Sequence, residues 1–380
     1  MREQHLTGVR TSVVEIGKRQ LGRLTHRIGT LPVLVLMPTS RCNCRCVMCD
    51  IWKADHGQEL TRADLAGHIE HLRSLGVKQV VLSGGEALMH PDLWGLCELL
   101  RTLSARIILL SSGLLLKQNA PEIIRWTDGV IVSLDGSQPV HDRIRNTPHA
   151  FAGLMEGVAA LKAFHPDYPV TGRSTLQRHN YFDLPNIIVT AREMGLDQIS
   201  FLAADVASEA FGRKQPWNKD RANGVALTPG EVKQFEGILE STVLRFADDF
   251  HRFIAESPDK LRRLVQYFAA LNGQASFPAN TCNAPWMSVV VEADGAVRPC
   301  FFHRPLGNIH TDSLAQILNS KASVSFRRNL DVRTDPVCER CVCTLNLASR
   351  ASLGIRALKP SVPPRNRGTS DLDGSLDERA

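Results

Sequence analysis

Pro38-Thr-Ser-Arg-Cys42-Asn-Cys-Arg-Cys46-Val-Met-Cys49-Asp-Ile-Trp52 is the stretch that decides the interpretation of this chain. It sets three cysteines at the spacing Cys42-x3-Cys46-x2-Cys49, directly after the apolar run at 31–37. Cysteine thiolates ligate iron–sulfur clusters, so three of them can hold three irons of a four-iron cluster and leave the fourth iron open. A structural zinc site requires four closed ligands. The odd set of three therefore points to chemistry at an open iron.

Length and composition are those of a globular protein. The chain has 380 residues, of which 43% are hydrophobic and 22% charged, which suffices for one large α/β domain and a smaller one. No run approaches the ~18 apolar residues of a membrane span, and the N-terminus lacks the apolar region of a signal peptide. Ten cysteines without an export signal indicate metal or redox use in a reducing cytoplasm. We therefore expect a cytoplasmic protein without a transmembrane segment.

The net charge of +6 is concentrated at the N-terminus. Residues 1–31 carry six Lys or Arg against two Glu, with apolar residues interleaved, which predicts a basic amphipathic helix. Packing on the domain with a solvated basic face is the simpler interpretation, and contact with a membrane surface is the alternative. Nucleic-acid binding is not expected, because no basic stripe with stacking aromatics follows.

Residues 32–215 alternate short β-like runs with helical stretches, which is typical of parallel βαβ units. The strands we expect are 32–38, 79–83, 106–111, 129–134, 170–177 and 198–203. The helices we expect lie near 61–75, 92–103, 118–126, 148–164 and 184–195. The first of these helices has Thr61 as N-cap with Asp64 three residues on, and Gly76 past its end. Six such strands fit a (β/α)6 partial TIM barrel of the α/β class.

The remainder divides into three further segments. Residues 216–281 form a connector with helices near 229–247 and 257–272. Residues 282–347 change in character to a small, β-rich, cysteine-bearing module. Residues 360–380 have almost no large apolar side chains and are expected to be a disordered tail.

The cysteine loop resembles that of the radical S-adenosylmethionine (radical SAM) enzymes. The resemblance implies that SAM binds the open iron through its amino and carboxylate groups and is cleaved by one electron to a 5′-deoxyadenosyl radical. The family often has an aromatic residue where this chain has Met48, a mild departure. Cys44 is an extra thiol within the loop and is interpreted as a bystander. The family's core is the (β/α)6 partial barrel, with its site at the C-terminal ends of the strands.

The second predicted strand ends in Gly84-Gly85-Glu86. Two glycines allow a ligand to approach the backbone closely, and a carboxylate can pair with an ammonium group. Alone, this triplet is equally typical of a tight turn from strand to helix. At this position it resembles the family's GGE motif, which implies that Gly84, Gly85 and Glu86 bind the SAM amino group.

The next three strand ends supply further candidates for SAM. The third ends in Ser111-Ser112-Gly113, where the family often has Thr-Asn-Gly, and the fourth ends in Ser133-Leu134-Asp135-Gly136, which closely resembles a family signature. The resemblance implies that Ser111 and Ser133 contact SAM. Arg173, in the fifth strand, can face a carboxylate of SAM or of the substrate, or be a surface residue. The adenine is expected against apolar residues of the sixth strand, namely Ile199, Phe201 and Leu202.

A second cysteine group comprises Cys282, Cys300, Cys338, Cys341 and Cys343. Its opening pair brackets a Gly-x4-Cys turn and resembles the SPASM/twitch extension of radical SAM enzymes. The resemblance implies an auxiliary [4Fe–4S] cluster held by Cys282, Cys300, Cys338 and Cys341, with Cys343 as a possible substitute for Cys341. Zinc is the alternative metal, because four cysteines with one C-x2-C pair are also compatible with it. No further cysteine follows Cys343, which favours the shorter twitch form with one auxiliary cluster.

These observations together predict a radical SAM enzyme with SAM and two [4Fe–4S] clusters, reduced by a donor such as flavodoxin or ferredoxin. Oxidation or rearrangement of a small biosynthetic molecule is the first hypothesis for its reaction. A peptide-modifying maturase is the second, although only about 30 residues precede the core, too few for a ~100-residue recognition domain. A non-catalytic iron–sulfur or zinc scaffold is the third. The loop at 203–213 is expected to contact the substrate, whereas His179, Asp205 and Glu209 are interpreted as structural.

Overall fold

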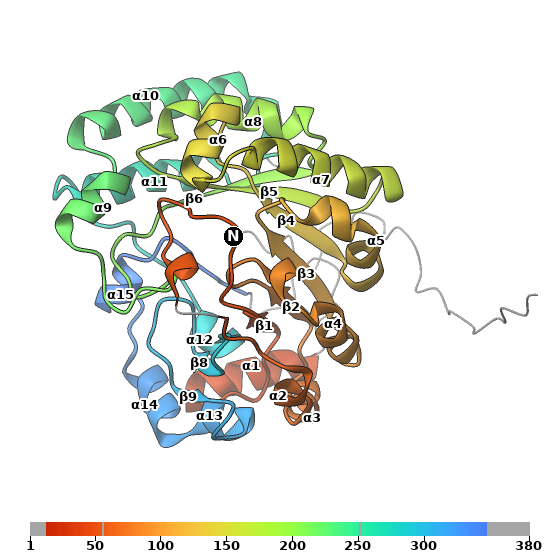
Figure 1. Ribbon diagram of the computed structural model, residues 1–380. Helices are drawn as coiled ribbons and strands as arrows, with labels where there is room; N and C mark the ends of the chain where they lie inside the picture. Colours follow the sequence, from red (N-terminus) through yellow and green to blue (C-terminus); the bar gives the residue numbers. More distant parts are fainter. Residues whose placement is uncertain (1–12, 55–56, 251, 348–380) are drawn as a thin grey trace, which may run out of the picture.

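A computed structural model describes residues 13–54, 57–250 and 252–347. Its centre is a curved parallel sheet with helices along the outer side (Figure 1). The barrel strands are β1 (Val33–Leu36), β2 (Gln79–Leu82), β3 (Arg106–Ser111), β4 (Gly129–Ser133), β5 (Val170–Leu176) and β6 (Gln198–Ala203). Each pairs in parallel with the next along the chain. The six predicted strands are confirmed within about two residues at each end.

Helices fill the connections between the strands. In the barrel they are α2 (Arg62–Ala66), α3 (Ile69–Ser74), α4 (Leu93–Arg101), α5 (Leu116–Trp126), α6 (Gln138–Arg145), α7 (Ala150–Phe164) and α8 (Leu184–Glu193). Before and after these lie α1 (Val13–Thr25), α9 (Lys219–Val225), α10 (Pro229–Arg245) and α11 (Pro258–Leu271). Single 3-10 turns are formed by Ile51–Lys53, Ala87–Met89, Tyr181–Asp183 and Ala247–Asp249.

The helix expected at 61–75 is interrupted. Thr61 and Asp64 form the predicted capping box. Gly76 follows the last helical turn with a φ of 67°, a conformation that favours glycine. Between them, α2 ends at Gly67, a poor helix former, and α3 begins after His68. His68 Nε2 lies 3.2 Å from Ile309 O, and His68 Nδ1 accepts a hydrogen bond from Leu314 N at 3.2 Å. The interruption thus lies where the barrel wall meets the C-terminal module.

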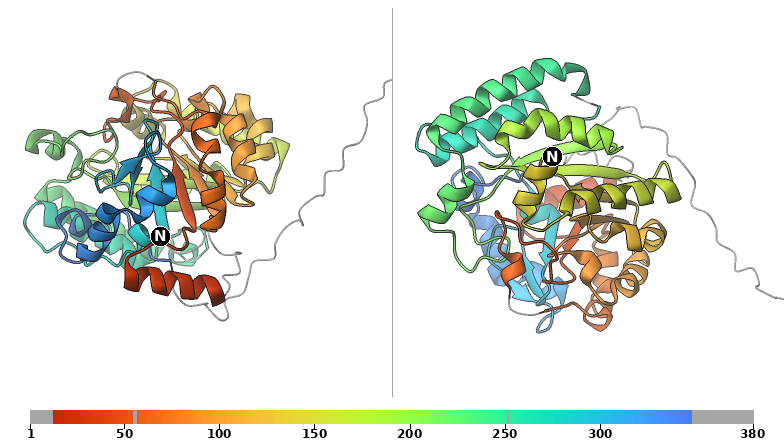
Figure 2. Two further views of the ribbon diagram at one scale, coloured as in Figure 1. Left: turned by 90° about the horizontal axis from the view of Figure 1, so that it is seen from below. Right: turned by 45° about the horizontal axis from the view of Figure 1, so that its top comes forward.

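The C-terminal module continues the sheet of the barrel. Strand β7 (Ser288–Val291) pairs in parallel with β1, and β8 (Ala296–Arg298) and β9 (Gly307–Asn308) follow antiparallel. Over the described residues the sheet order is β6-β5-β4-β3-β2-β1-β7-β8-β9. Four short helices accompany these strands in the part described: α12 (Ala284–Met287), α13 (Leu314–Asn319), α14 (Lys321–Asn329) and α15 (Pro336–Glu339). From below, the light-blue strands of the module lie beside β1 (Figure 2).

The hydrophobic core has two parts, one on each face of the sheet. The larger lies between the outer face and the helices and includes Leu34, Leu36, Val80 and Leu82. The smaller lies on the inner face and joins the barrel to the module; it comprises Val33, Val35, Met37, Met287, Val290 and Leu347. Successive strand residues face opposite sides, and all four residues of β1 are apolar because both of its faces are covered.

The ends of the chain are described only in part. Helix α1 lies within the basic segment predicted at 1–31, and its Leu24 is 80% exposed. The tail predicted at 360–380 lies outside the described residues. The division into five segments stays a prediction. Among the helices of the described part, none has the length and apolarity needed to cross a membrane.

Candidate functional site

The cysteine loop begins at the carboxyl end of β1 and is held on one side by the turn after β2. Gly85 N donates to Thr39 O at 3.1 Å, and Glu86 N donates to Arg41 O at 2.7 Å. A Cβ placed on Gly85 would lie 2.0 Å from Arg41 O, and Gly84 has a φ of 110°. Glycine is therefore required here for close contact between two backbone segments. Any contact of these residues with SAM stays a prediction.

Glu86 is fully buried beneath this contact. Its carboxylate accepts from Ser111 Oγ at 3.1 Å, and from Ser112 N and Ser112 Oγ at 2.7 Å each. Burial raises the pKa of Glu86, and the hydrogen bonds from Ser112 act in the opposite direction. The structure thus brings the predicted residues Glu86 and Ser111 together, as partners of one another at the carboxyl ends of two neighbouring strands.

The three predicted thiols lie on one loop, where burial and nearby charges set their ionisation. Burial raises the pKa of both Cys42 and Cys49 to about 12. The hydrogen bond with Cys44, aided by the positive charge of Arg145, lowers the pKa of Cys46 to about 6. A bound metal deprotonates a coordinating thiol outright. The donor set therefore fits an iron–sulfur cluster, because the positive charge of its irons would take the place of the protons on Cys42, Cys46 and Cys49.

Arg145 is a residue of this site whose role the sequence did not reveal. It lies at the C-terminal end of α6, with Nη1 3.6 Å from Cys46 Sγ. Its guanidinium forms an ion pair with Asp135, whose side chain is inaccessible to solvent. Its carbonyl oxygen accepts from Arg45 N at 3.1 Å, so it also holds the backbone of the cysteine loop.

Ser133 and Arg173 are brought together on the inner face of the barrel. They are directly opposite in the register of β4 and β5, and Arg173 Nε donates to Ser200 Oγ at 3.3 Å. Because side chains alternate along β6, Ile199 and Phe201 pack into the outer core instead. The expectation that these two residues support the adenine is therefore wrong, while Leu202 shares the inner face with Ser200.

The loop after β6 is tied to the cysteine loop. Arg213, which is 6% exposed, pairs with Asp205 at 2.6 Å and donates to Met48 O at 3.3 Å. Asp50 N donates to Phe211 O at 3.0 Å. A cavity of about 720 Å³ reaches from Gly84 and Gly85 to this loop. Glu209 also lines this cavity and pairs with Arg304 at 2.8 Å, and the structural interpretation of Asp205 and Glu209 stays a prediction.

The second cysteine group lines one open cavity of about 1350 Å³ between the module and the inner face of the barrel. Burial raises the pKa of Cys300 to about 11 and also raises that of Cys282. Asn280, which the sequence did not single out, donates to the carbonyl oxygens of Cys338 at 2.7 Å and Cys341 at 3.3 Å. Partly buried thiols around one cavity fit an auxiliary cluster.

The barrel side of this cavity is apolar except for Gln79 and Arg173. The apolar barrel residues that line it are Val33, Val35, Val81, Leu110 and Ile131. The cavity therefore joins the second cysteine group to the lumen in which Arg173 lies.

Two family models match this arrangement. The sequence matches the radical SAM superfamily over residues 36–189 and an iron–sulfur cluster-binding domain, SPASM, over residues 282–342. The chain belongs to the radical SAM superfamily. The first match covers β2 to β5, the cysteine loop and the Gly-Gly-Glu turn, and the second covers β7 to β9 and four of the module's cysteines.

Relatives agree with this membership, and a solved structure shares the fold. This radical SAM protein is 27% identical over 317 residues to the PqqA peptide cyclase of Ruegeria pomeroyi, covering 80% of this chain and 77% of the relative. It is 24% identical over 344 residues to the Fe-coproporphyrin III synthase of Methanosarcina barkeri, covering 84% of each. Its fold matches that of Streptococcus suis SuiB bound to S-adenosylmethionine, with a TM-score of 0.60 and 12% identity over 90% of this chain and 80% of SuiB.

The predicted family, fold and enzyme class are thereby confirmed. The membership supports SAM and iron–sulfur clusters as cofactors of this radical SAM enzyme, and it favours iron over zinc in the C-terminal module. It also argues against the non-catalytic scaffold, because the relatives are named as a cyclase and a synthase.

Proposed function

We propose that this enzyme carries two [4Fe–4S] clusters and modifies a small, largely apolar substrate with an anionic group, by oxidation or rearrangement. Bound together, the core cluster and SAM supply a 5′-deoxyadenosyl radical that removes a hydrogen atom from the substrate. The cavity between barrel and module carries this proposal, because it combines an apolar wall, one guanidinium and the second cysteine group.

The side chains of the cavity have distinct tasks in this proposal. Arg173 binds the anionic group, as a guanidinium suits carboxylate and phosphate oxygens. The apolar residues of β1 to β4 bury the remainder of the substrate and exclude water from the radical. A substrate in this position contacts the module on its other side, which supports an auxiliary cluster that exchanges an electron with it.

The proposal also assigns the ligand sets. Cys42, Cys46 and Cys49 hold the core cluster in this proposal, and the auxiliary cluster is held by Cys282, Cys300, Cys338 and Cys341. For SAM, the turn at Gly84, Gly85 and Glu86 with Ser111 and Ser133 provides polar groups at the carboxyl ends of β2 to β4.

A peptide substrate is the second candidate. It is supported by the 27% identity to a relative named PqqA peptide cyclase over most of both chains. In that case the open cavity would receive a side chain of the peptide rather than a whole molecule.

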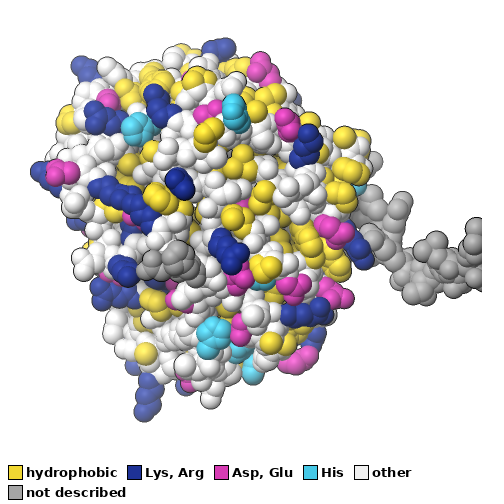
Figure 3. Space-filling model, viewed as in Figure 1, with side chains coloured by type: hydrophobic (Ala, Val, Ile, Leu, Met, Phe, Trp, Pro, Cys, Tyr) yellow, Lys and Arg dark blue, Asp and Glu magenta, His cyan; other side chains and the backbone are white. Residues whose placement is uncertain are grey.

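We further propose that an acidic electron carrier, such as flavodoxin or ferredoxin, docks beside the cysteine loop. Lys and Arg side chains gather on this face near α9 and the segment before it (Figure 3). Arg45, Lys53 and Lys214 are exposed there or on the cysteine loop. Opposite charge on the carrier would steer the encounter and speed it at low salt.

Iron and sulfide content tests the cluster assignment. Wild-type protein reconstituted without oxygen should bind about eight irons, falling to about four in the variant Cys42→Ala/Cys46→Ala/Cys49→Ala, because each cluster holds four. Cys46→Ala should abolish 5′-deoxyadenosine formation, whereas Cys341→Ala should retain it without product. Wild-type protein that holds only zinc would refute the proposal.

The substrate class is tested with extract fractions. A metabolite fraction should increase 5′-deoxyadenosine formation by wild-type enzyme and much less by Arg173→Leu. Stimulation by the peptide fraction alone would favour the second candidate instead.

A further inference from the structure

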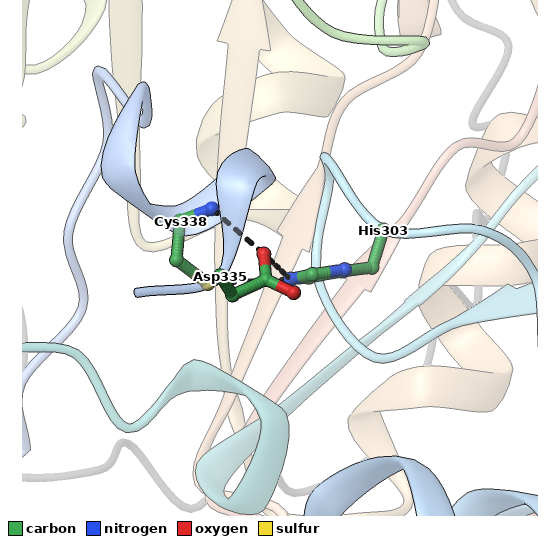
Figure 4. A group of neighbouring side chains, drawn as sticks. All are labelled: His303, Asp335 and Cys338. Carbon is green, nitrogen blue, oxygen red and sulfur yellow. Dashed lines mark hydrogen bonds and ion pairs between the residues drawn. The ribbon is translucent and has the colours of Figure 1, made fainter. Parts of the chain in front are cut away.

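One buried histidine points at a thiol of the second cysteine group. His303 Nε2 lies 3.3 Å from Cys338 Sγ, within hydrogen-bonding distance for sulfur, and the residue is 7% exposed. Figure 4 shows the ring edge directed towards the N-terminal turn of α15, which carries Cys338. The sequence did not draw attention to His303, because 35 residues separate it from this partner.

The ring is held in place from several sides. Phe326 packs against it edge-on, with ring centroids 4.9 Å apart. Arg298, itself paired with Glu292 at 2.7 Å, donates to the carbonyl oxygen of His303 at 3.1 Å. These contacts connect His303 to β8 and α14, so its position is set by the module's framework rather than by the thiol alone.

Asp335 holds Cys338, the residue that His303 contacts, in place. Its Oδ1 accepts from Val337 N and Cys338 N, both at 3.0 Å, as the N-cap of α15. The same oxygen lies 3.8 Å from His303 Nε2. A carboxylate and a sulfur on the same side of the ring favour a proton on Nε2, because both attract a hydrogen-bond donor.

The bonding direction follows from the chemistry of a cluster ligand. A thiolate bound to iron has no proton, so an imidazole nitrogen at this distance interacts favourably only as the donor. We propose that His303 donates an N–H···S hydrogen bond to the Cys338 thiolate of the auxiliary cluster and is a positioning residue that raises the cluster's reduction potential. This inference rests on the proposed function, which places a cluster on Cys338.

The sign of the effect is determined by charge. A reduced cluster carries one more negative charge than an oxidised one, so a donor to its sulfur stabilises the reduced form more. Hydrogen bonds to the sulfurs are among the factors that set cluster potentials. Loss of the donor should therefore make the auxiliary cluster harder to reduce, which would weaken it as an electron acceptor.

The experiment uses the full chain with Cys42→Ala/Cys46→Ala/Cys49→Ala, so that only the auxiliary cluster is observed. In this parent, His303→Leu removes the donor and His303→Gln retains an N–H of similar reach. His310→Leu is the matched control, an exposed histidine of the same module that pairs with Asp64. Iron content and the midpoint potential are measured for each protein by anaerobic redox titration.

We expect about four irons per chain throughout, a more negative potential for His303→Leu, and values near the parent for His303→Gln and His310→Leu. An unchanged potential in fully loaded His303→Leu would overturn the hydrogen bond while leaving the two-cluster proposal intact. A parent without iron would overturn both.

If His303→Leu loses its cluster, a measurement on the parent protein still tests the hydrogen bond. In the reduced parent, hyperfine spectroscopy should detect a proton near the cluster that exchanges in D2O, and weak nitrogen coupling that changes when histidine is labelled with 15N. Strong nitrogen coupling typical of an iron–nitrogen bond would overturn the proposal, since His303 would then be a ligand. Absence of any histidine coupling would also overturn it.

Discussion

At the scale of single residues, Arg145 stabilises the core site through a buried charge pair. Its partner Asp135 is fully buried and also accepts from Thr175 N at 2.8 Å. Arg145→Leu should lower the free energy of unfolding of the iron-free protein by about 3–5 kcal/mol, because Asp135 is left as an unpaired buried charge. Denaturant titration measures this. The control is Arg143→Leu, which removes an exposed arginine of the same helix. Its free energy of unfolding should stay within about 0.5 kcal/mol of the wild-type value, and equal losses in the two variants would contradict the prediction.

The choice between Cys341 and Cys343 is also a matter of single residues. Cys338 and Cys341 share the turn that Asn280 holds through both carbonyl oxygens, whereas Cys343 lies beyond it. In the variant that lacks the core cysteines, Cys343→Ala should therefore keep about four irons and Cys341→Ala should lose most of them. Iron analysis and the visible spectrum measure the outcome. The reverse pattern would make Cys343 the ligand.

The sequence predicted the thiols but not the residues around them. Cysteine spacing is local, so the Cys42, Cys46 and Cys49 set is visible in one stretch of chain. Arg145 and Cys46 are 99 positions apart, and their contact depends on how α6 packs under the loop. Such packing leaves no periodic signal, which is why Arg145, Asn280 and His303 emerge only from the structure.

At the scale of elements, the close contact between the cysteine loop and the turn after β2 is possible because Gly85 has no side chain. Gly85→Ala should push Arg41 and the loop aside, which costs about 1–3 kcal/mol as overpacking does and lowers the core iron content. The control is Gly67→Ala, where a Cβ meets nothing within 4 Å. It should be neutral or stabilising by up to about 1 kcal/mol. Full core iron in Gly85→Ala would contradict the prediction.

The elements themselves were predictable to different degrees. The strands were found because apolar runs between turn residues mark a parallel sheet covered on both faces. Helix α6 was missed because Gln138–Arg145 is short and polar, and its buried positions include His141 and Arg145. Helix α9 was missed for a similar reason, since Val225 is its one buried residue.

At the scale of the whole molecule, the barrel and the module share one sheet. A chain that ends at residue 281 would leave the edge of β1 unpaired and expose Val33 and Val35 on the inner face. We expect such a chain to aggregate, because exposed apolar strand edges invite pairing between molecules. Size-exclusion chromatography measures this, with a chain that ends at residue 347 as the control. A monomeric, folded short chain would show that the barrel is stable without β7.

The pairing of β1 with β7 also governs the order of folding during synthesis. About 250 residues separate the two strands, and a ribosome adds roughly 5–20 residues per second. The first strand to emerge must therefore wait roughly 10–50 s for its last neighbour. During that interval one edge of β1 has no partner strand. The cysteine loop is therefore synthesised long before β7 and the module that cover the inner face of the barrel.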